Sequence, residues 1–152
     1  MTDLIIFSAK YLYLVSMALF IGYGFMARDK KQFLTLSFFT FLLAYLLGAL
    51  TNDLYNNPRP FVVSGIAPLV EHAADNGFPS GHTLLAASLA AVVTIVRPSL
   101  GVVLWVLALI VGVARVLAGV HHGIDIVGSI TIAIVSVVAV YYFLKYYASP
   151  GK

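Results

Sequence analysis

The sequence predicts an all-helical membrane protein, a bundle of about five transmembrane helices in one domain covering residues 1–152. Three observations support this fold class. Hydrophobic residues make up 61% of the 152 residues, whereas soluble globular domains are about 45–50% apolar. Mean hydropathy is +0.99, and only 10% of residues are charged. Five apolar runs are also long enough, or nearly so, to cross a hydrocarbon core, which takes about 20 helical residues.

The five apolar runs are the predicted transmembrane helices. They cover Leu4–Phe25, Phe33–Leu50, Gly81–Val96, Leu100–Ala118 and Ile124–Leu144. The first run has no basic segment before it and no small-residue cleavage site close after it, so we expect a retained span rather than a removed signal peptide. The third run is short, but it is rich in alanine, serine and glycine, which let neighbouring helices approach closely. We therefore expect the third helix at the centre of the bundle.

The connections between these runs differ in character. Ala27–Gln32 is a tight charged turn, and Pro98 helps to form the turn Arg97–Ser99. Residues 51–79 are instead a long polar connection with four prolines. Loops longer than about 12–15 residues are usually functional or disordered. The apolar middle of this connection, Phe61–Val70, is expected to lie on or dip into the membrane surface.

The charges predict how the helices cross the membrane. Five crossings place six cations and one acid on one side: Arg28, Lys30, Lys31, Arg97, Lys145, Lys152 and Asp29. The opposite side holds five acids and three cations: Asp3, Asp53, Glu71, Asp75, Asp125, Lys10, Arg59 and Arg115. Basic residues favour the cytoplasmic side, so the N-terminus and the long loop are expected to face outward from the cell (plasma or inner) membrane. This orientation accounts for the net charge of +3, and no nucleic-acid partner is expected.

The first of three polar clusters on the outward side runs from Asn52 to Pro60. Proline on both sides of Arg59 restricts the backbone to extended conformations. The guanidinium is thereby presented from a stiff segment, and a planar, permanently charged group suits a phosphate. For this cluster alone, an arginine that anchors the loop at the membrane interface is the preferred interpretation.

The second cluster is Pro79-Ser80-Gly81-His82, at the start of the third predicted helix. Ser80 is a typical N-cap residue. The free backbone N–H groups of the first helical turn, with Gly81 leaving them uncovered, form an anion site. His82 would stand beside that site as a proton donor. The alternative is a simple helix cap with a surface histidine.

The third cluster lies in the stretch Ala114–Asp125, where an arginine, two histidines and an aspartate separate two apolar runs. Polar residues of this kind inside a membrane protein are costly and are usually functional. If the fifth helix starts near His121, Asp125 lies four residues further on the same face and can accept from one imidazole nitrogen. The other nitrogen is then free to act as a nucleophile. Arg115 can reach the same pocket, although the pair alone would also fit a hydrogen bond that only caps the helix.

Taken in order, the three clusters resemble the signature of the type-2 phosphatidic acid phosphatase superfamily. That superfamily includes bacterial membrane lipid phosphatases, glucose-6-phosphatase, soluble acid phosphatases and vanadium haloperoxidases. The matching residues are Arg59-Pro60, Pro79-Ser80-Gly81-His82, and Arg115 followed by five residues, His121, three residues and Asp125. The resemblance covers about half of the chain, and the bacterial membrane branch fits it best because this chain spans the membrane.

The resemblance implies a role for each matching residue. His121 would be the nucleophile that forms a phosphohistidine, held by Asp125; it is selected over His122 because the family pattern leaves three residues before the aspartate. His82 would protonate the leaving oxygen and then activate water. The phosphoryl oxygens would be bound by Arg59, Arg115, Ser80 and the backbone N–H of Gly81. No metal and no cofactor are expected, since we find no carboxylate cluster that would hold a metal.

Two positions depart from the family pattern. Asn52 stands where the pattern has a lysine, seven residues before the arginine, and Ala114 stands where it usually has a serine. One hypothesis is that Lys10, about 9 Å along the first helix from Leu4, supplies the missing positive charge to the phosphate. The alternative for Lys10 is a side chain that extends to the outer headgroups.

The predicted function is hydrolysis of a membrane lipid phosphate or diphosphate through a phosphohistidine, at the level of the outer headgroups. Undecaprenyl diphosphate, phosphatidylglycerophosphate, phosphatidic acid and a lipid A phosphate are all open as substrates. A second hypothesis is phosphoryl transfer to another lipid or sugar. A third, motivated by Asn52 and Ala114, is a lipid-phosphate binding or transport protein with weakened catalysis. The oligomeric state is left open.

Overall fold

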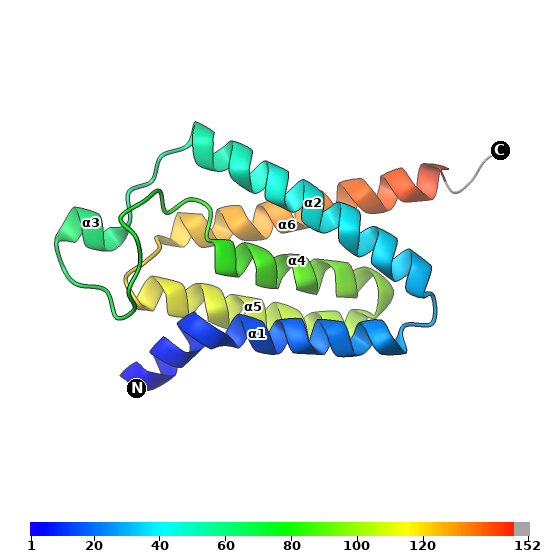
Figure 1. Cartoon of the computed structure of the whole chain (residues 1–152), viewed down its shortest axis with the longest axis horizontal. Coiled ribbons are helices and arrows are strands. Elements are labelled where there is room, and N and C mark those ends of the chain that lie inside the picture. The colour runs from blue at the N-terminus through cyan, green and yellow to red at the C-terminus, as the bar shows by residue number, and fades with distance from the viewer. Residues whose placement is uncertain (148–152) are drawn as a thin grey trace.

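The fold is an all-helical bundle, and its computed structural model describes residues 1–147 (Figure 1). Lys152, counted above among the cations, lies outside the described residues. The helices are α1 (Thr2–Met26), α2 (Lys30–Leu54), α3 (Pro60–Ser64), α4 (Gly81–Val96), α5 (Pro98–Leu117) and α6 (Gly123–Tyr147). Within residues 1–147 there is no β-strand, only an isolated bridge between Pro58 and Asn76.

The five predicted helices are all present. Four of them, α1, α2, α5 and α6, are long and apolar enough to cross a membrane, and α4 is a shorter apolar helix of 16 residues. The turn predicted over Ala27–Gln32 is too long, because α2 already begins at Lys30. The carboxylate of Asp29 accepts a hydrogen bond from the backbone N–H of Gln32 at 2.9 Å, so it caps the helix three residues earlier than hydropathy indicates.

Helix α4 lies at the centre of the bundle, which confirms the prediction. It packs against α1, α2, α5 and α6, while the outer helices pair as α1 with α5 and α2 with α6 (Figure 1). Ala86, Ala87 and Ala90 of α4 have no exposed surface. Small side chains on this helix allow four neighbours to approach it closely. Large apolar side chains cover the outside of the outer helices, as expected of a surface in contact with lipid.

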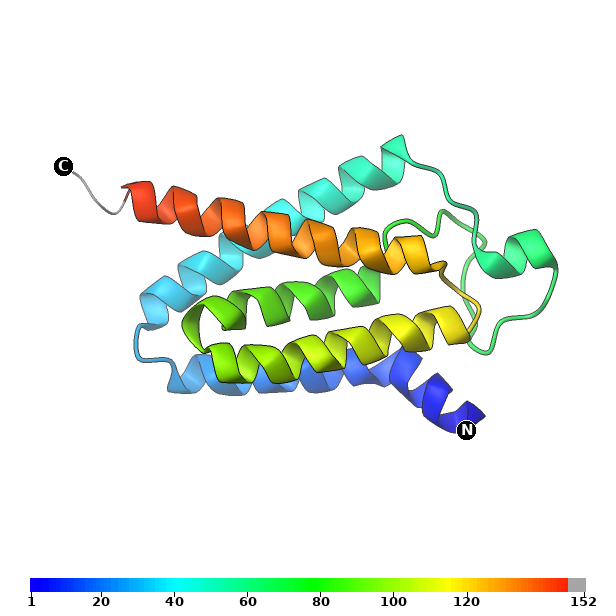
Figure 2. The same ribbon diagram turned by 180° about the vertical axis from the view of Figure 1, so that it is seen from behind.

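The connections that carry the three polar clusters meet at one end of the bundle. The loops on both sides of α3 lie beside the end of α5 and the starts of α4 and α6 (Figures 1 and 2). The backbone N–H of Leu69 donates to the carbonyl of Ala118 at 2.9 Å, and Phe61 and Val70 pack with Ala9. The long connection is therefore held against the ends of α1 and α5. Contact between its exposed apolar residues and the membrane surface stays a prediction.

Candidate active site

Arg59 is held in place along its whole guanidinium group. The residue is 4% exposed. Its Nη1 donates to the carbonyl of Val120 at 2.9 Å and its Nε donates to the carboxylate of Asp75 at 2.7 Å. Nη1 also lies 3.3 Å from Nε2 of His121. Because Pro60 begins α3 and Arg59 is its extended N-cap residue, the backbone and the side chain are both fixed.

His121 and Asp125 form the buried pair that their spacing predicts, although the local structure differs from the expected helix face. Nδ1 of His121 lies 3.2 Å from Oδ2 of Asp125. Helix α6 begins at Gly123, so His121 lies before the helix. Asp125 is the third residue of α6, and Oδ2 also accepts from the backbone N–H of His122 at 2.8 Å. This is half of a capping box, and it directs the carboxylate back toward the imidazole.

The carboxylate of Asp125 is fully buried and makes a further hydrogen bond. Asn57 donates from Nδ2 to Oδ1 at 2.6 Å. With Nδ1 of His121 as a donor to Asp125, Nε2 carries the lone pair. Burial lowers the pKa of His121; the hydrogen bond to Asp125 opposes this, and the charges of Arg115 and Arg59 add to the lowering. The imidazole is therefore neutral, with Nε2 available as a nucleophile.

Arg115, in the last turn of α5, approaches the same nitrogen, Nε2 of His121. Its Nη2 lies 3.4 Å from Nε2 of His121, and its Nη1 donates to the carbonyl of Ala9 at 3.4 Å. The side chain is buried and, in residues 1–147, its Nε has no hydrogen-bond partner. Two guanidinium groups thus flank one neutral nitrogen, an arrangement that suits an oxyanion group at Nε2.

A cavity of about 440 Å³ opens beside Arg115, and neither Arg59 nor His121 is among its lining residues. It is lined by Lys10, Tyr11, Val70, Glu71, His72, Ala73, His82 and Arg115. His82 is half-buried, and its ring meets Tyr13 edge-on with a centroid distance of 4.7 Å. The structure therefore brings His82, Arg115 and Lys10 to one cavity.

The start of α4 differs in one detail from the prediction. Ser80 is at the N-cap position, but its hydroxyl makes no capping bond to the helix backbone. The hydroxyl is fully buried and lies 3.1 Å from Oγ1 of Thr83. Gly81 is exposed, and a Cβ at this position would meet nothing within 4 Å. The backbone at Gly81 is therefore accessible, whereas the Ser80 hydroxyl faces Thr83.

Asn52 does not line the cavity. Its Nδ2 donates to the carbonyl of Phe78 at 2.6 Å, and its own carbonyl accepts from Asn76 at 2.8 Å. The amide of Asn76 also accepts from the backbone N–H groups of Asn57 and Phe78. Asn52 and Asn76 therefore fasten the end of α2 to the loops that carry Arg59 and Ser80.

Sequence reasoning missed several residues of this group. Asp75 accepts from Arg59, and His72 meets the ring of His121 with a centroid distance of 6.1 Å. Asn57 supports Asp125 and Asn76 joins the loops. All four lie in the long connection, where a single polar residue has no periodicity to mark it. The available signals were the length of that connection and, for Asn57, its place in the polar cluster from Asn52 to Pro60.

The neighbouring Arg59 keeps the carboxylate of Asp75 ionised. Partial burial would raise the pKa of Asp75, but the hydrogen bond and the positive charge of Arg59 outweigh it and hold the pKa below its usual range. Burial lowers the pKa of His72, and the charge of Arg59 adds to this effect.

Within residues 1–147 no group of three or more histidine, aspartate and glutamate side chains is placed to hold a metal ion.

Comparison with known proteins points to one family. Residues 33–148 match the model of the PAP2 superfamily. The chain is 26% identical over 144 residues to the bacitracin transport permease protein BcrC of Bacillus licheniformis, covering 93% of this chain and 71% of that one. It is 32% identical over 96 residues to the undecaprenyl-diphosphatase BcrC of Bacillus subtilis (strain 168), covering 63% of this chain and 50% of that one.

A solved structure shares the fold. The crystal structure of Aquifex aeolicus LpxE superposes with a TM-score of 0.72 at 24% identity, covering 93% of this chain and 82% of that one. The chain thus spans about half of the second curated relative and most of the solved structure.

Proposed function

This chain belongs to the PAP2 superfamily, and from that membership and the geometry around His121 we propose that it is a membrane lipid phosphatase. The observation that carries the proposal is the position of Nε2 of His121, 3.3 Å from Nη1 of Arg59 and 3.4 Å from Nη2 of Arg115. A nucleophilic nitrogen between two guanidinium groups is suited to attack a phosphorus atom whose oxygens those groups bind.

The reaction proceeds in two displacements. Nε2 of His121 attacks phosphorus, a P–N bond forms, and the P–O bond to the lipid breaks. Asp125 holds the Nδ1 proton and stabilises the positive charge that develops on the ring. His82 donates a proton to the leaving oxygen. It then takes a proton from water, whose oxygen attacks phosphorus, so that the P–N bond breaks and inorganic phosphate leaves.

The phosphoryl oxygens are bound from three directions in this proposal. Arg59 and Arg115 supply the guanidinium donors, and the accessible backbone at Gly81 supplies an N–H at the start of α4. Ser80 joins them only if its hydroxyl turns away from Thr83, to which it now lies at 3.1 Å. These chain groups bind the phosphoryl group without a metal ion.

The substrate class follows from where the cavity opens. It lies at one end of a bundle of membrane-spanning helices, with Lys10 and Tyr11 of α1 on its rim. The substrate we propose is a lipid phosphate or diphosphate in the bilayer, such as undecaprenyl diphosphate, phosphatidylglycerophosphate or phosphatidic acid. The site faces the extracytoplasmic side of the cell membrane, and residues 1–152 act as one domain.

Phosphate release from a panel of such lipids by purified protein, with a chelator present, tests the proposal. Replacing His121 by alanine should lower activity by about a thousandfold or more, since the nucleophile is lost. His122→Ala is the matched control, because His122 is the adjacent histidine and meets Asn57 rather than the arginines. The His122 variant should keep most activity.

The activities of the two variants and the products formed distinguish the proposed mechanism from its alternatives. Equal activity of wild type and His121→Ala, or loss only in His122→Ala, would contradict the assignment of the nucleophile. Labelled phosphate that appears on a second lipid or a sugar rather than in solution would indicate a phosphotransferase. Tight binding of lipid phosphate with no turnover of any substrate would indicate a binding or transport protein.

A further inference from the structure

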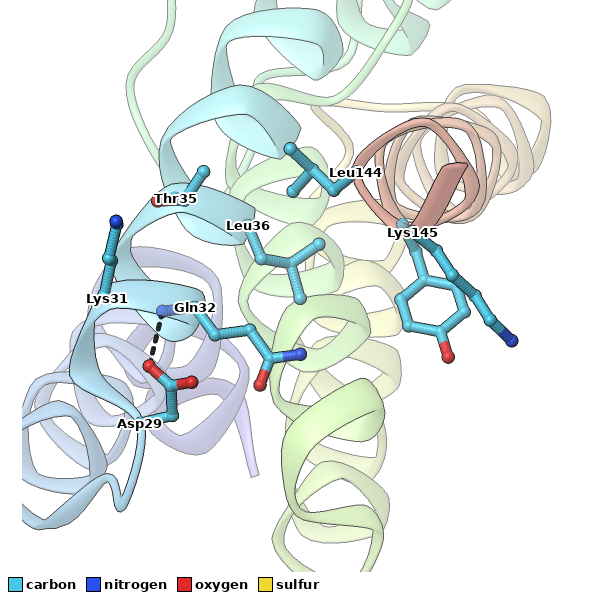
Figure 3. Close-up of a pocket in the computed structure, with 8 residues that line it drawn as sticks. Asp29, Lys31, Gln32, Thr35, Leu36, Leu144 and Lys145 are labelled. Carbon is cyan, nitrogen blue, oxygen red and sulfur yellow. Dashed lines mark hydrogen bonds between the residues drawn. The ribbon is translucent and has the colours of Figure 1, made fainter. Parts of the chain in front are cut away.

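A second large cavity lies at the end of the bundle opposite the candidate active site. It has a volume of about 520 Å³ and lies between the start of α2 and the end of α6 (Figure 3). Its lining consists of Asp29, Lys31, Gln32, Thr35, Leu36, Tyr141, Leu144 and Lys145. None of these residues belongs to the proposed phosphatase site.

The cavity exists because two paired helices diverge. Helices α2 and α6 cross near their middles and separate toward the end of the bundle where α2 begins and α6 ends (Figures 1 and 2). Gln32 and Leu36 extend from α2 in the direction of α6 and lie in front of α4, with Lys31 on the α2 side and Lys145 on the α6 side (Figure 3). We call this space, with the residues listed above, the α2–α6 wedge.

A separate apolar groove lies beside the wedge. It has a volume of about 320 Å³ and is lined by Phe39, Leu42, Leu43, Leu46, Ala139, Val140 and Phe143. The α2 residues of both cavities share one face of that helix, but the α6 residues lie on different faces of α6. The groove and the wedge are therefore two cavities with α6 between them.

The charge at the mouth of the wedge is positive and is not balanced within the described chain. The ion pairs of residues 1–147 involve Asp75 and Asp125, both at the other end of the bundle. The single acid at the wedge, Asp29, accepts the backbone N–H of Gln32. Lys31 and Lys145 are exposed and line the wedge, and Nζ of Lys145 lies 5.9 Å from the centre of the Tyr141 ring in the same lining.

The wedge lies at the depth of lipid headgroups. Tyr142, Tyr146 and Tyr147, at the end of α6, are 63%, 77% and 66% exposed. Tyrosines collect where the hydrocarbon core meets the headgroups. Basic pockets between transmembrane helices at this depth are typical sites for anionic headgroups.

We propose that the α2–α6 wedge is a binding site for an anionic phospholipid of the leaflet opposite the candidate active site. The lipid phosphate binds between Lys31 and Lys145, the amide of Gln32 and the hydroxyl of Tyr141 contact the headgroup, and the acyl chains lie against the exposed apolar side chains of the bundle. A zwitterionic lipid fits less well, because its own cation opposes the two lysines. The proposal is independent of the phosphatase activity.

Lipid binding to the full chain in detergent, followed by native mass spectrometry, tests the headgroup site. Phosphatidylglycerol and phosphatidylcholine with identical acyl chains are the probes. The wild type should bind the first phosphatidylglycerol about tenfold or more tightly than phosphatidylcholine. Replacing Lys31 and Lys145 by glutamine should weaken phosphatidylglycerol binding about five-fold for each lysine, the effect of one basic residue near an anionic headgroup.

Lys30→Gln is the matched control for the headgroup. Lys30 is an exposed neighbour of Lys31 that does not line the wedge, and its replacement should leave the preference within about twofold of wild type. If Lys30→Gln weakens binding as much as Lys31→Gln, or if the wild type does not prefer phosphatidylglycerol, the binding is diffuse surface attraction and the proposed site is wrong.

Discussion

Asp75 is the residue that determines how Arg59 is presented to His121. Its carboxylate accepts the Nε–H of Arg59 at 2.7 Å, while Nη1 faces Val120 and His121 and Nη2 donates to the carbonyl of Asn76 at 3.3 Å. A negative charge near a phosphate site also repels the substrate. Because 61% of the Asp75 side chain is exposed, solvent screens this repulsion, so we expect the orienting hydrogen bond to matter more than the charge.

Two substitutions separate these effects of Asp75. Asp75→Ala should raise KM for a lipid phosphate about three- to tenfold, because Arg59 loses the hydrogen bond that orients it. Asp75→Asn keeps an oxygen acceptor and removes the charge, so its KM should equal or fall below that of the wild type. Steady-state kinetics of both variants checks this prediction. Similar increases in KM for both would show instead that the charge of Asp75 is what matters.

We propose that Lys10 supplies the positive charge that Asn52 lacks. Lys10 lines the cavity with His82 and Arg115, while the side chain of Asn52 is bonded to the carbonyl of Phe78. Lys10→Met should therefore raise KM about tenfold, with a smaller change in kcat, since a hydrogen bond to a charged group is lost at a partly exposed position. Lys10→Arg, which keeps the charge, should restore most of the affinity. Unchanged activity and phosphate affinity in Lys10→Met would contradict the compensation.

Helices α4 and α5 approach each other closely at Gly101. A Cβ at Gly101 would lie 2.6 Å from Cα and 2.9 Å from the backbone N of Thr94. Main-chain atoms inside a helix cannot move aside as a flexible side chain can. The two helices therefore pack at a distance that only glycine permits at this position.

Gly101→Ala should lower the free energy of unfolding by about 1–3 kcal/mol, the usual cost of overpacking a tight contact. Gly22→Ala is the matched control, because a Cβ at Gly22, inside α1, would meet nothing within 4 Å. That substitution should be neutral or stabilising by about 0.5–1 kcal/mol. Unfolding in mixed detergent micelles measures both variants. A Gly101→Ala protein as stable as the wild type would show that α5 can move away from α4.

For the whole molecule, the charge distribution predicts which end of the bundle faces the outside of the cell. The chain has no cysteine, so a single introduced cysteine reports its own accessibility. Ser64, at the end of α3, and Ser99, in the first turn of α5, are both exposed and lie at opposite ends of the bundle (Figure 1).

The charge distribution predicts the labelling pattern of these two serines. In intact cells, a membrane-impermeant maleimide should label Ser64→Cys and should label Ser99→Cys only after the membrane is opened, because the basic end of the bundle is expected in the cytoplasm. The reverse pattern would show that the site faces the cytoplasm, and equal labelling of both in intact cells would rule out a fixed orientation of this kind.

Much of the fold and part of the candidate site were predictable from the sequence. Hydropathy located all five long helices, since an apolar run of this length has few other stable states in a bilayer, and the small residues of Gly81–Val96 placed that helix at the centre. Spacing brought His121 together with Asp125, and motif order brought Arg59 and Arg115 to the same histidine.

The tertiary structure alone decided which polar loop residues act on the site. Asn57, His72, Asp75 and Asn76 reach it from a connection without periodicity, and their partners, such as Asp125 and His121, are up to 68 residues away along the chain. It also decided that the Ser80 hydroxyl faces Thr83 and that α2 and α6 diverge into a wedge. Local sequence determines which segments become helices, because hydrogen bonding and burial in a membrane are local requirements. Contacts between distant loops and the angle between two helices depend on how all the segments pack.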